Sequence, residues 1–161
     1  MKIVDSNLLN ELADKAANSP RKRTHYNLHP DLDDKIHRLC LGVDPGSYVR
    51  PHRHLTPEKW ELLVILKGKL AVLTFDEKGK VLSRIELDAE GDIKSIELDA
   101  GDWHTFACLE RGTVVFEIKR GPYSRPIEKD FASWAPEEGE PRAIELEKLF
   151  ADAKVGDALN Q

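Results

Sequence analysis

Residues 60–75 read WELLVILKGKLAVLTF, two apolar runs on either side of Lys67-Gly68. Each run has the length of a β-strand and is apolar at neighbouring as well as alternating positions. Strands of this kind are buried on both faces, so we expect both at the centre of the fold. One face would line the interior, and a helix, the C-terminal segment or a second subunit would cover the other. Lys67-Gly68 suits a two-residue hairpin turn between them.

Short strand-like segments continue on both sides of this pair. Together they predict strands at residues 36–43, 48–50, 60–66, 69–75, 81–87, 93–98, 104–109 and 113–119. Many short strands separated by turns indicate an antiparallel sandwich or barrel. The sequence therefore predicts a mainly β fold.

Helical periodicity occurs near both ends, over residues 4–16 and 143–154. We expect an N-terminal helix and loop within residues 1–35, packed on a β-barrel over 36–120. Residues 121–161 would form an ordered extended segment and a short C-terminal helix.

The composition excludes some function classes. The net charge is −5, which gives no basic surface for nucleic acid. No apolar run approaches the roughly 20 residues that cross a bilayer, and residues 1–15 carry acidic side chains where a signal peptide is apolar. We therefore expect a cytoplasmic protein without a membrane partner. Cys40 and Cys108 make no disulfide framework, and we expect buried, inert thiols.

Three histidines and a carboxylate are candidate metal ligands. His52 and His54 are two positions apart, so both point to the same side of an extended chain. Glu61 begins the apolar run, where a carboxylate needs a partner to be buried. His104 follows a turn at Gly101 and would face them from another strand. This set suits a divalent transition metal, with iron, manganese, nickel, cobalt and zinc all compatible.

Glu58 competes with Glu61 for the carboxylate position. Glu58 is closer to His54 in sequence, whereas Glu61 lies inside the predicted strand. We favour Glu61 as the ligand and place Glu58 in the loop beside Pro57.

Three further residues are candidates for binding substrate. Arg50 precedes His52 by two positions and would bind a carboxylate or phosphate, or else pair with a structural acid. Lys119 would point into the barrel or outward into water. Tyr123 would cover the mouth of the site or pack on the barrel.

The spacing of these residues resembles the two cupin motifs. The first is matched by Gly46, His52, His54, Glu61 and Gly68, although six residues separate His54 from Glu61 where the motif allows three or four. Gly101 and His104 match the second motif, whereas Asp99 and Cys108 replace its proline and asparagine.

Longer stretches resemble the WbuC family of cupin fold metalloproteins. They cover roughly residues 22–138 and include RKRTHYNLH, GSYVRPHRH, KWELLVILKG and WHTFACLERGTVVFEIKRGPY. The resemblance implies a bacterial metal-bound cupin with a link to O-antigen clusters, and assigns no reaction or catalytic residue.

Taken together, we expect a metal-binding cupin that acts on a small polar substrate such as a sugar derivative, as a homodimer. Isomerisation and oxygen-dependent oxidation are both open. A non-catalytic metal- or sugar-binding module and a metal-free sugar epimerase are the alternatives.

Overall fold

A computed structural model of the protein describes residues 1–55 and 59–160. Its elements follow in the order α1 (Ser6–Asn18), β1 (Arg23–Asn27), β2 (Ile36–Val43), β3 (Glu61–Lys67), β4 (Lys69–Phe75), β5 (Val81–Asp88), β6 (Ser95–Leu98), β7 (Trp103–Cys108), β8 (Thr113–Arg120), η1 (Glu128–Asp130) and α2 (Pro141–Asp152). The predicted mainly β fold with a helix near each end is confirmed. Among the described residues no helix is long and apolar enough to span a membrane.

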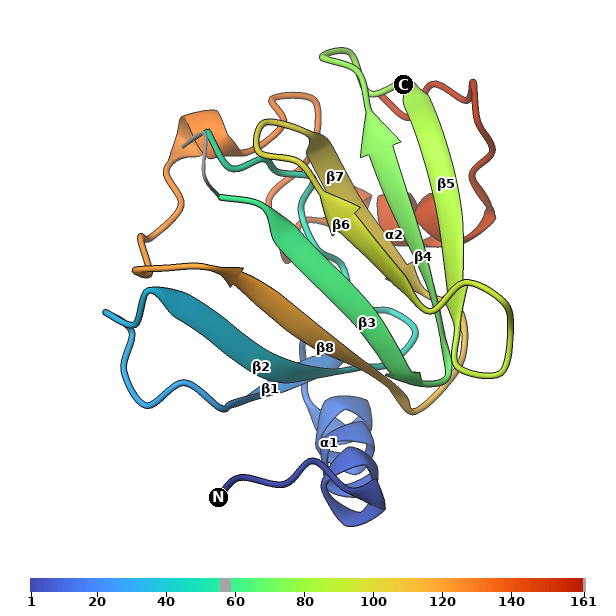
Figure 1. The fold of residues 1–161 in the computed structure, drawn as a ribbon. Helices are drawn as coiled ribbons and strands as arrows, with labels where there is room; N and C mark the ends of the chain where they lie inside the picture. The colour runs from blue at the N-terminus through green and yellow to red at the C-terminus, as the bar shows by residue number, and fades with distance from the viewer. Residues whose placement is uncertain (56–58, 161) are drawn as a thin grey trace.

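The strands form two antiparallel sheets that face each other (Figure 1). The larger sheet has the order β1-β2-β8-β3-β6, and the smaller one has the order β5-β4-β7. The expected β-barrel is present in an open form, because the two sheets do not close into a barrel within the described chain. The fold is an open two-sheet sandwich, with its core between the sheets.

Gly68 is the corner between the two sheets. β3 pairs with β6 and β8, whereas β4 pairs with β5 and β7, so the predicted β3–β4 hairpin is wrong. Gly68 has φ 73°, and a Cβ atom there would clash with Thr113. The corner therefore requires glycine, and the two apolar runs become interior strands of opposite sheets.

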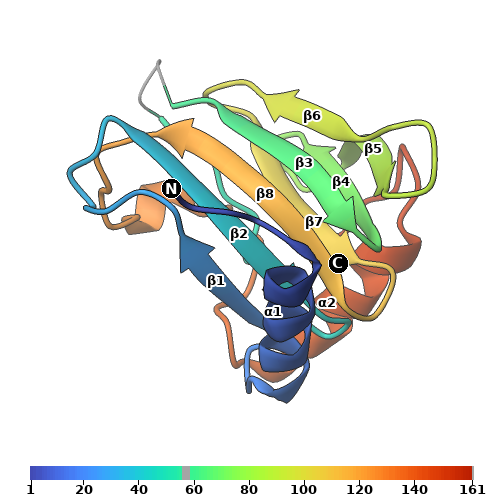
Figure 2. The ribbon, with the colours of Figure 1, turned by 60° about the horizontal axis from the view of Figure 1, so that its bottom comes forward.

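The helices cover the outer faces of the sheets. α1 lies against β1 and β2 of the larger sheet (Figure 2). Its Leu12 and Ala13 pack on Cys40 and Val114 of that sheet. Phe150 of α2 belongs to the cluster that covers the outer face of β4. This cover explains why β4 is apolar on both faces.

Two segments differ from the expected strands. Residues 48–50 form no strand; next to them, His52 makes isolated bridges to His104 and Phe131. β1, at Arg23–Asn27, lies in a stretch that the sequence marks as loop, since it is polar on both faces. Backbone pairing with β2 holds this segment in a strand, although its own side chains do not show a strand pattern.

Candidate metal centre

The four predicted ligands converge at one end of the sandwich. One ligand atom from each of His52, His54, Glu61 and His104 lies within 4.8 Å of the other three. Glu61 is the first residue of β3 and is only 6% exposed, while His104 in β7 is 4% exposed. The centre therefore joins both sheets and the segment that precedes β3.

Backbone hydrogen bonds fix the orientation of two imidazoles. Nδ1 of His52 lies 3.0 Å from the carbonyl oxygen of Arg50, and Nδ1 of His104 lies 2.8 Å from that of Asp102. A carbonyl only accepts, so each Nδ1 carries the proton. In the neutral ring Nε2 then holds the lone pair, which is the arrangement found in metal-binding histidines.

The surroundings of Glu61 test whether a cation fits the centre. Nε2 of His104 lies 3.3 Å from Glu61 Oε2, but it is buried and makes no hydrogen bond of regular geometry to any described residue. Nε2 of His54 lies 3.0 Å from Glu61 Oε1. Imidazole lone pairs and a carboxylate that face each other repel, unless a proton or a metal ion lies between them. The donor set therefore fits a divalent metal.

The charges of the centre follow from burial and from these contacts. Burial, together with the neighbouring His104, lowers the pKa of His52 to about 3. Burial opposes ionisation of Glu61, but Lys119, His104 and His54 hold its pKa well below the usual value. Burial also opposes a charged His104, yet the Glu61 carboxylate raises its pKa. At neutral pH the centre thus holds an ionised carboxylate beside a neutral His52.

Lys119 connects the centre to a second buried carboxylate. Its Nζ lies 3.0 Å from Glu61 Oε1 and 2.6 Å from Glu117 Oε1. Burial disfavours the ammonium, but Glu117 and Glu61 raise the pKa of Lys119, so it stays charged. Lys119 and Glu117 therefore point inward.

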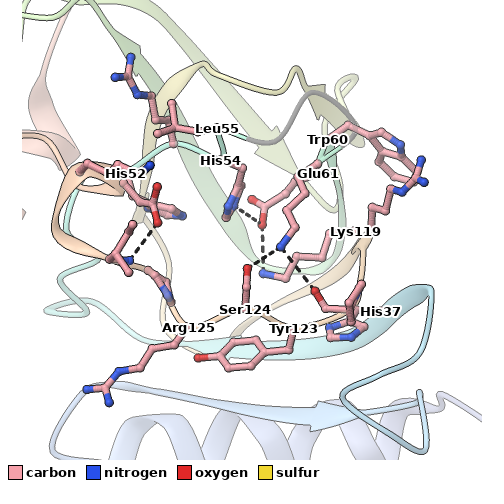
Figure 3. A pocket seen from close by; sticks show the side chains of 18 residues that line it. His37, His52, His54, Leu55, Trp60, Glu61, Lys119, Tyr123, Ser124 and Arg125 are labelled. Atoms are coloured by element: carbon pink, nitrogen blue, oxygen red, sulfur yellow. Dashed lines mark hydrogen bonds and ion pairs between the residues drawn. The ribbon is translucent and has the colours of Figure 1, made fainter.

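Two cavities adjoin the centre, and His52, Glu61 and Lys119 line both of them. The inner cavity has a volume of about 190 Å³ and extends between the sheets toward Thr105 and Phe106. The outer cavity has about 400 Å³ and opens between the centre and the segment 122–130 (Figure 3).

The other candidate residues take different positions. Arg50 forms an ion pair with Glu128 at 2.8 Å and lines neither cavity, which is the structural pairing left open above. Tyr123 is 53% exposed and lines the outer cavity instead of packing in the core. Glu58 lies outside the described residues. The substrate-binding roles of Arg50, Lys119 and Tyr123 stay predictions.

The outer cavity also contains residues that the sequence did not single out. Lys59 reaches across to Ser124, and Arg125 and Lys129 follow on the same segment. Exposed cations are common on any surface, so a single sequence gives no signal that separates these from the rest.

Comparisons with known proteins agree with the fold. The chain is similar to a cupin superfamily protein from Desulfitobacterium hafniense, with 17% identity over 74% of this chain and 95% of that one and a TM-score of 0.51. It is also similar to a conserved protein of unknown function from Streptococcus pyogenes, with 12% identity over 76% and 90% of the two chains and a TM-score of 0.50. These likenesses show the cupin fold, as the motif resemblance predicted.

Comparisons of the sequence identify a family for the chain but no curated relative. No curated protein matches the chain. Membership of the WbuC family stays a prediction, because the matching family model bears another description. That model is Domain of unknown function (DUF6016), which matches residues 4–87, more than half of the 161 residues, and the chain belongs to this family.

Proposed function

We propose that the protein binds a divalent transition metal through His52, His54, Glu61 and His104, and uses it on a small polar substrate. The observation that carries the proposal is the convergence of three imidazoles on the buried Glu61 carboxylate, with the Nε2 atoms of His54 and His104 at 3.0 and 3.3 Å from its oxygens. A metal bound there would act as a Lewis acid or orient substrate and water.

The chain's own residues would hold the reactants in place. The backbone carbonyls fix the tautomers of His52 and His104, and Lys119 forms an ion pair with Oε1 of Glu61. The two cavities give a substrate access to the centre from the outer side and room between the sheets on the inner side.

Metal content tests this proposal directly. We expect close to one equivalent of metal in purified, tag-free protein by elemental mass spectrometry, and its loss in Glu61→Gln. Glu97→Gln is the matched control, because Glu97 is an exposed carboxylate on β6, the strand that pairs with β3. Folded protein that takes up no metal even after reconstitution would overturn the proposal.

A metal-free reaction is the second candidate, and one contact favours it. The 3.0 Å approach of His54 Nε2 to Glu61 Oε1 resembles a histidine–acid pair that could move a proton, as a sugar epimerase requires. Full activity in metal-free protein would support this candidate. Binding of a ligand without turnover would instead support a metal- or sugar-binding module.

Narrower proposals rest on the WbuC resemblance. It supports a cytoplasmic bacterial protein acting on a sugar derivative in surface-polysaccharide, or O-antigen, biosynthesis. Altered surface polysaccharide in a strain that lacks the protein would test this link.

We also propose a homodimer. Leu62, Val64 and Ile118 lie on the outer face of the larger sheet and are only half-buried. A second copy of the chain could cover this face. A monomer by light scattering at micromolar concentration would contradict it.

A further inference from the structure

We infer that the outer cavity binds the anionic group, a carboxylate or a phosphate, of a small organic ligand. The inference deepens the proposed function, because it assigns a substrate class to the cavity that opens on the candidate metal centre. It rests on the charged side chains that line the cavity and on the ion pairs and hydrogen bonds that these side chains form.

Positive charge dominates the wall of the cavity. Among the residues that the structure describes, the carboxylates that line it are Glu61 and Asp130. The cations that line it are Arg53, Lys59, Lys119, Arg120, Arg125 and Lys129. The chain as a whole has net charge −5, so the charge of this wall is opposite in sign to that of the whole chain. A concave surface of one sign attracts ligands of the opposite sign.

Some of these cations are neutralised within the protein. Arg53 pairs with Glu77 at 2.9 Å, and Lys119 pairs with Glu61 and Glu117. These two therefore shape the site but leave little charge for a ligand.

Lys59 is different, because its partners among the described residues are neutral. Its Nζ donates to the hydroxyl of Ser124 at 2.6 Å and to the carbonyl of Pro122 at 3.4 Å. These contacts hold the ammonium against the segment across the cavity, and no carboxylate in the described part of the chain forms an ion pair with it. A positioned cation with a free charge is the element that an anionic ligand requires.

Three further cations have no acidic partner among the residues that the structure describes. Arg120 ends β8, and Arg125 and Lys129 lie on the segment that borders the cavity. All three are exposed, and none forms an ion pair with another described residue. Their guanidinium and ammonium groups are therefore available to a ligand.

The described carboxylates of the wall form no ion pair with these cations. Glu61 is committed to Lys119 and the histidines. Asp130 accepts a hydrogen bond from the backbone N–H of Ile127 at 2.9 Å. Each carboxylate thus has a local role.

The size of the cavity limits the ligand to a small molecule. A volume of about 400 Å³ lies within the range of small-molecule sites, roughly 300–1,000 Å³. His54 and Glu61 lie on the opposite side from Ser124 and Arg125 (Figure 3). A ligand whose anionic group lies at the 122–130 segment can therefore extend toward the metal centre. Trp60 and Tyr123 add apolar surface that would shield the ion pairs from water.

Two double variants with equal loss of charge test the inference. Lys59→Gln/Lys129→Gln removes cavity cations, whereas Lys78→Gln/Lys148→Gln removes exposed lysines that line neither cavity. The probes are inorganic phosphate and acetate, titrated at millimolar concentration while backbone amide NMR signals are recorded. Their comparison shows which anionic group the cavity prefers.

We expect one or both anions to shift the amide signals of Lys59, Ser124 and Arg125 in the unmodified protein and in the control variant. The cavity variant should bind at least about tenfold more weakly, equivalent to about 1.4 kcal/mol, and added NaCl should weaken binding. No shift at these amides, or equal affinity in both variants, would overturn the inference.

The same samples separate this inference from the metal proposal. Each titration is made on metal-free and on metal-loaded protein, and metal content is measured in parallel. Anion binding that persists in protein unable to take up metal would support the inference while the metal proposal fails. Full metal content without an anion response at the cavity would overturn the inference alone.

Discussion

His52 and His104 are joined through their backbones as well as through their rings. His52 N–H donates to the His104 carbonyl at 3.0 Å, His104 N–H donates to the His52 carbonyl at 2.9 Å, and the ring centroids are 4.5 Å apart. Backbone pairing fixes the positions of both Cα atoms, and it does not depend on the identity of the side chains. Two ligands of the candidate centre are thus preorganised by the fold.

Replacing either imidazole should therefore remove metal and spare the fold. We expect His104→Ala and His52→Ala to bind zinc more than about tenfold more weakly, since each loses a direct ligand. Competition with a chromophoric chelator measures this, and far-UV circular dichroism should stay unchanged. His25→Ala is the control, because His25 is exposed on β1. Equal affinity in His104→Ala and His25→Ala would remove His104 from the centre.

Lys119 should stabilise the metal-free protein by compensating two buried carboxylates. In Lys119→Met, Glu61 and Glu117 lose their shared cation, and we expect a loss of about 3 kcal/mol in the free energy of unfolding. Urea unfolding in EDTA measures this loss. Bound metal would compensate Glu61, so the loss should be smaller in metal-loaded protein. A loss of the same size in both forms would contradict this role of the metal.

The titration of His52 predicts how stability depends on pH without metal. Its pKa is about 3 in the folded protein against about 6.5 when unfolded, so below pH 6.5 the unfolded chain binds the extra proton. Its contribution to stability should fall as the pH drops from about 6.5 to 3, by up to about 1.4 kcal/mol per pH unit.

His52→Gln isolates that contribution, because glutamine does not titrate. We expect a shallower acid slope of the unfolding free energy in this variant than in the unmodified protein, both in EDTA. The raised pKa of His104 acts in the opposite direction: it adds stability below pH 6.5 that is lost as the pH rises through its folded value. Identical slopes in the two proteins would refute a neutral His52.

The thiols should be unreactive in the folded protein. Burial raises the pKa of Cys108 to about 11 and also raises that of Cys40, so little thiolate forms near pH 8. Iodoacetamide at pH 8 should modify neither cysteine under native conditions and both in urea, as counted by intact-mass spectrometry. Rapid native labelling of Cys108 would show that its surroundings open.

The sequence predicted those parts of the fold that depend on local pattern. β2 and β4 have the predicted bounds, since apolar runs between turn residues define both ends. Closure and strand pairing could not be predicted, because they depend on contacts across the fold. Thus Gly68 in a short turn suggests a hairpin, whereas the contact with Thr113 makes it a corner.

In the candidate centre, too, only the features that depend on local sequence could be predicted. Strand alternation was enough to bring His52 and His54 to one side, and the cost of burying a carboxylate singled out Glu61. The partners of Lys59 and Arg50 lie at least 63 positions away, at Pro122, Ser124 and Glu128. No short-range pattern contains that information.

The corner at Gly68 gives a prediction with a matched control. Gly68 and Gly112 have nearly equal φ angles of 73° and 75°, so alanine carries the same backbone cost at both, about 1–2 kcal/mol. At Gly112 the new Cβ would meet Ala13 at an ordinary 3.6 Å. At Gly68 it would clash with Thr113, which is fully buried and whose hydroxyl hydrogen-bonds to both the N–H and the carbonyl of Lys69. Thr113 cannot move without breaking these bonds, so Gly68→Ala should cost about 1–3 kcal/mol more than Gly112→Ala. Urea unfolding of both variants measures the difference, and equal losses would show that the clash at the corner relaxes freely.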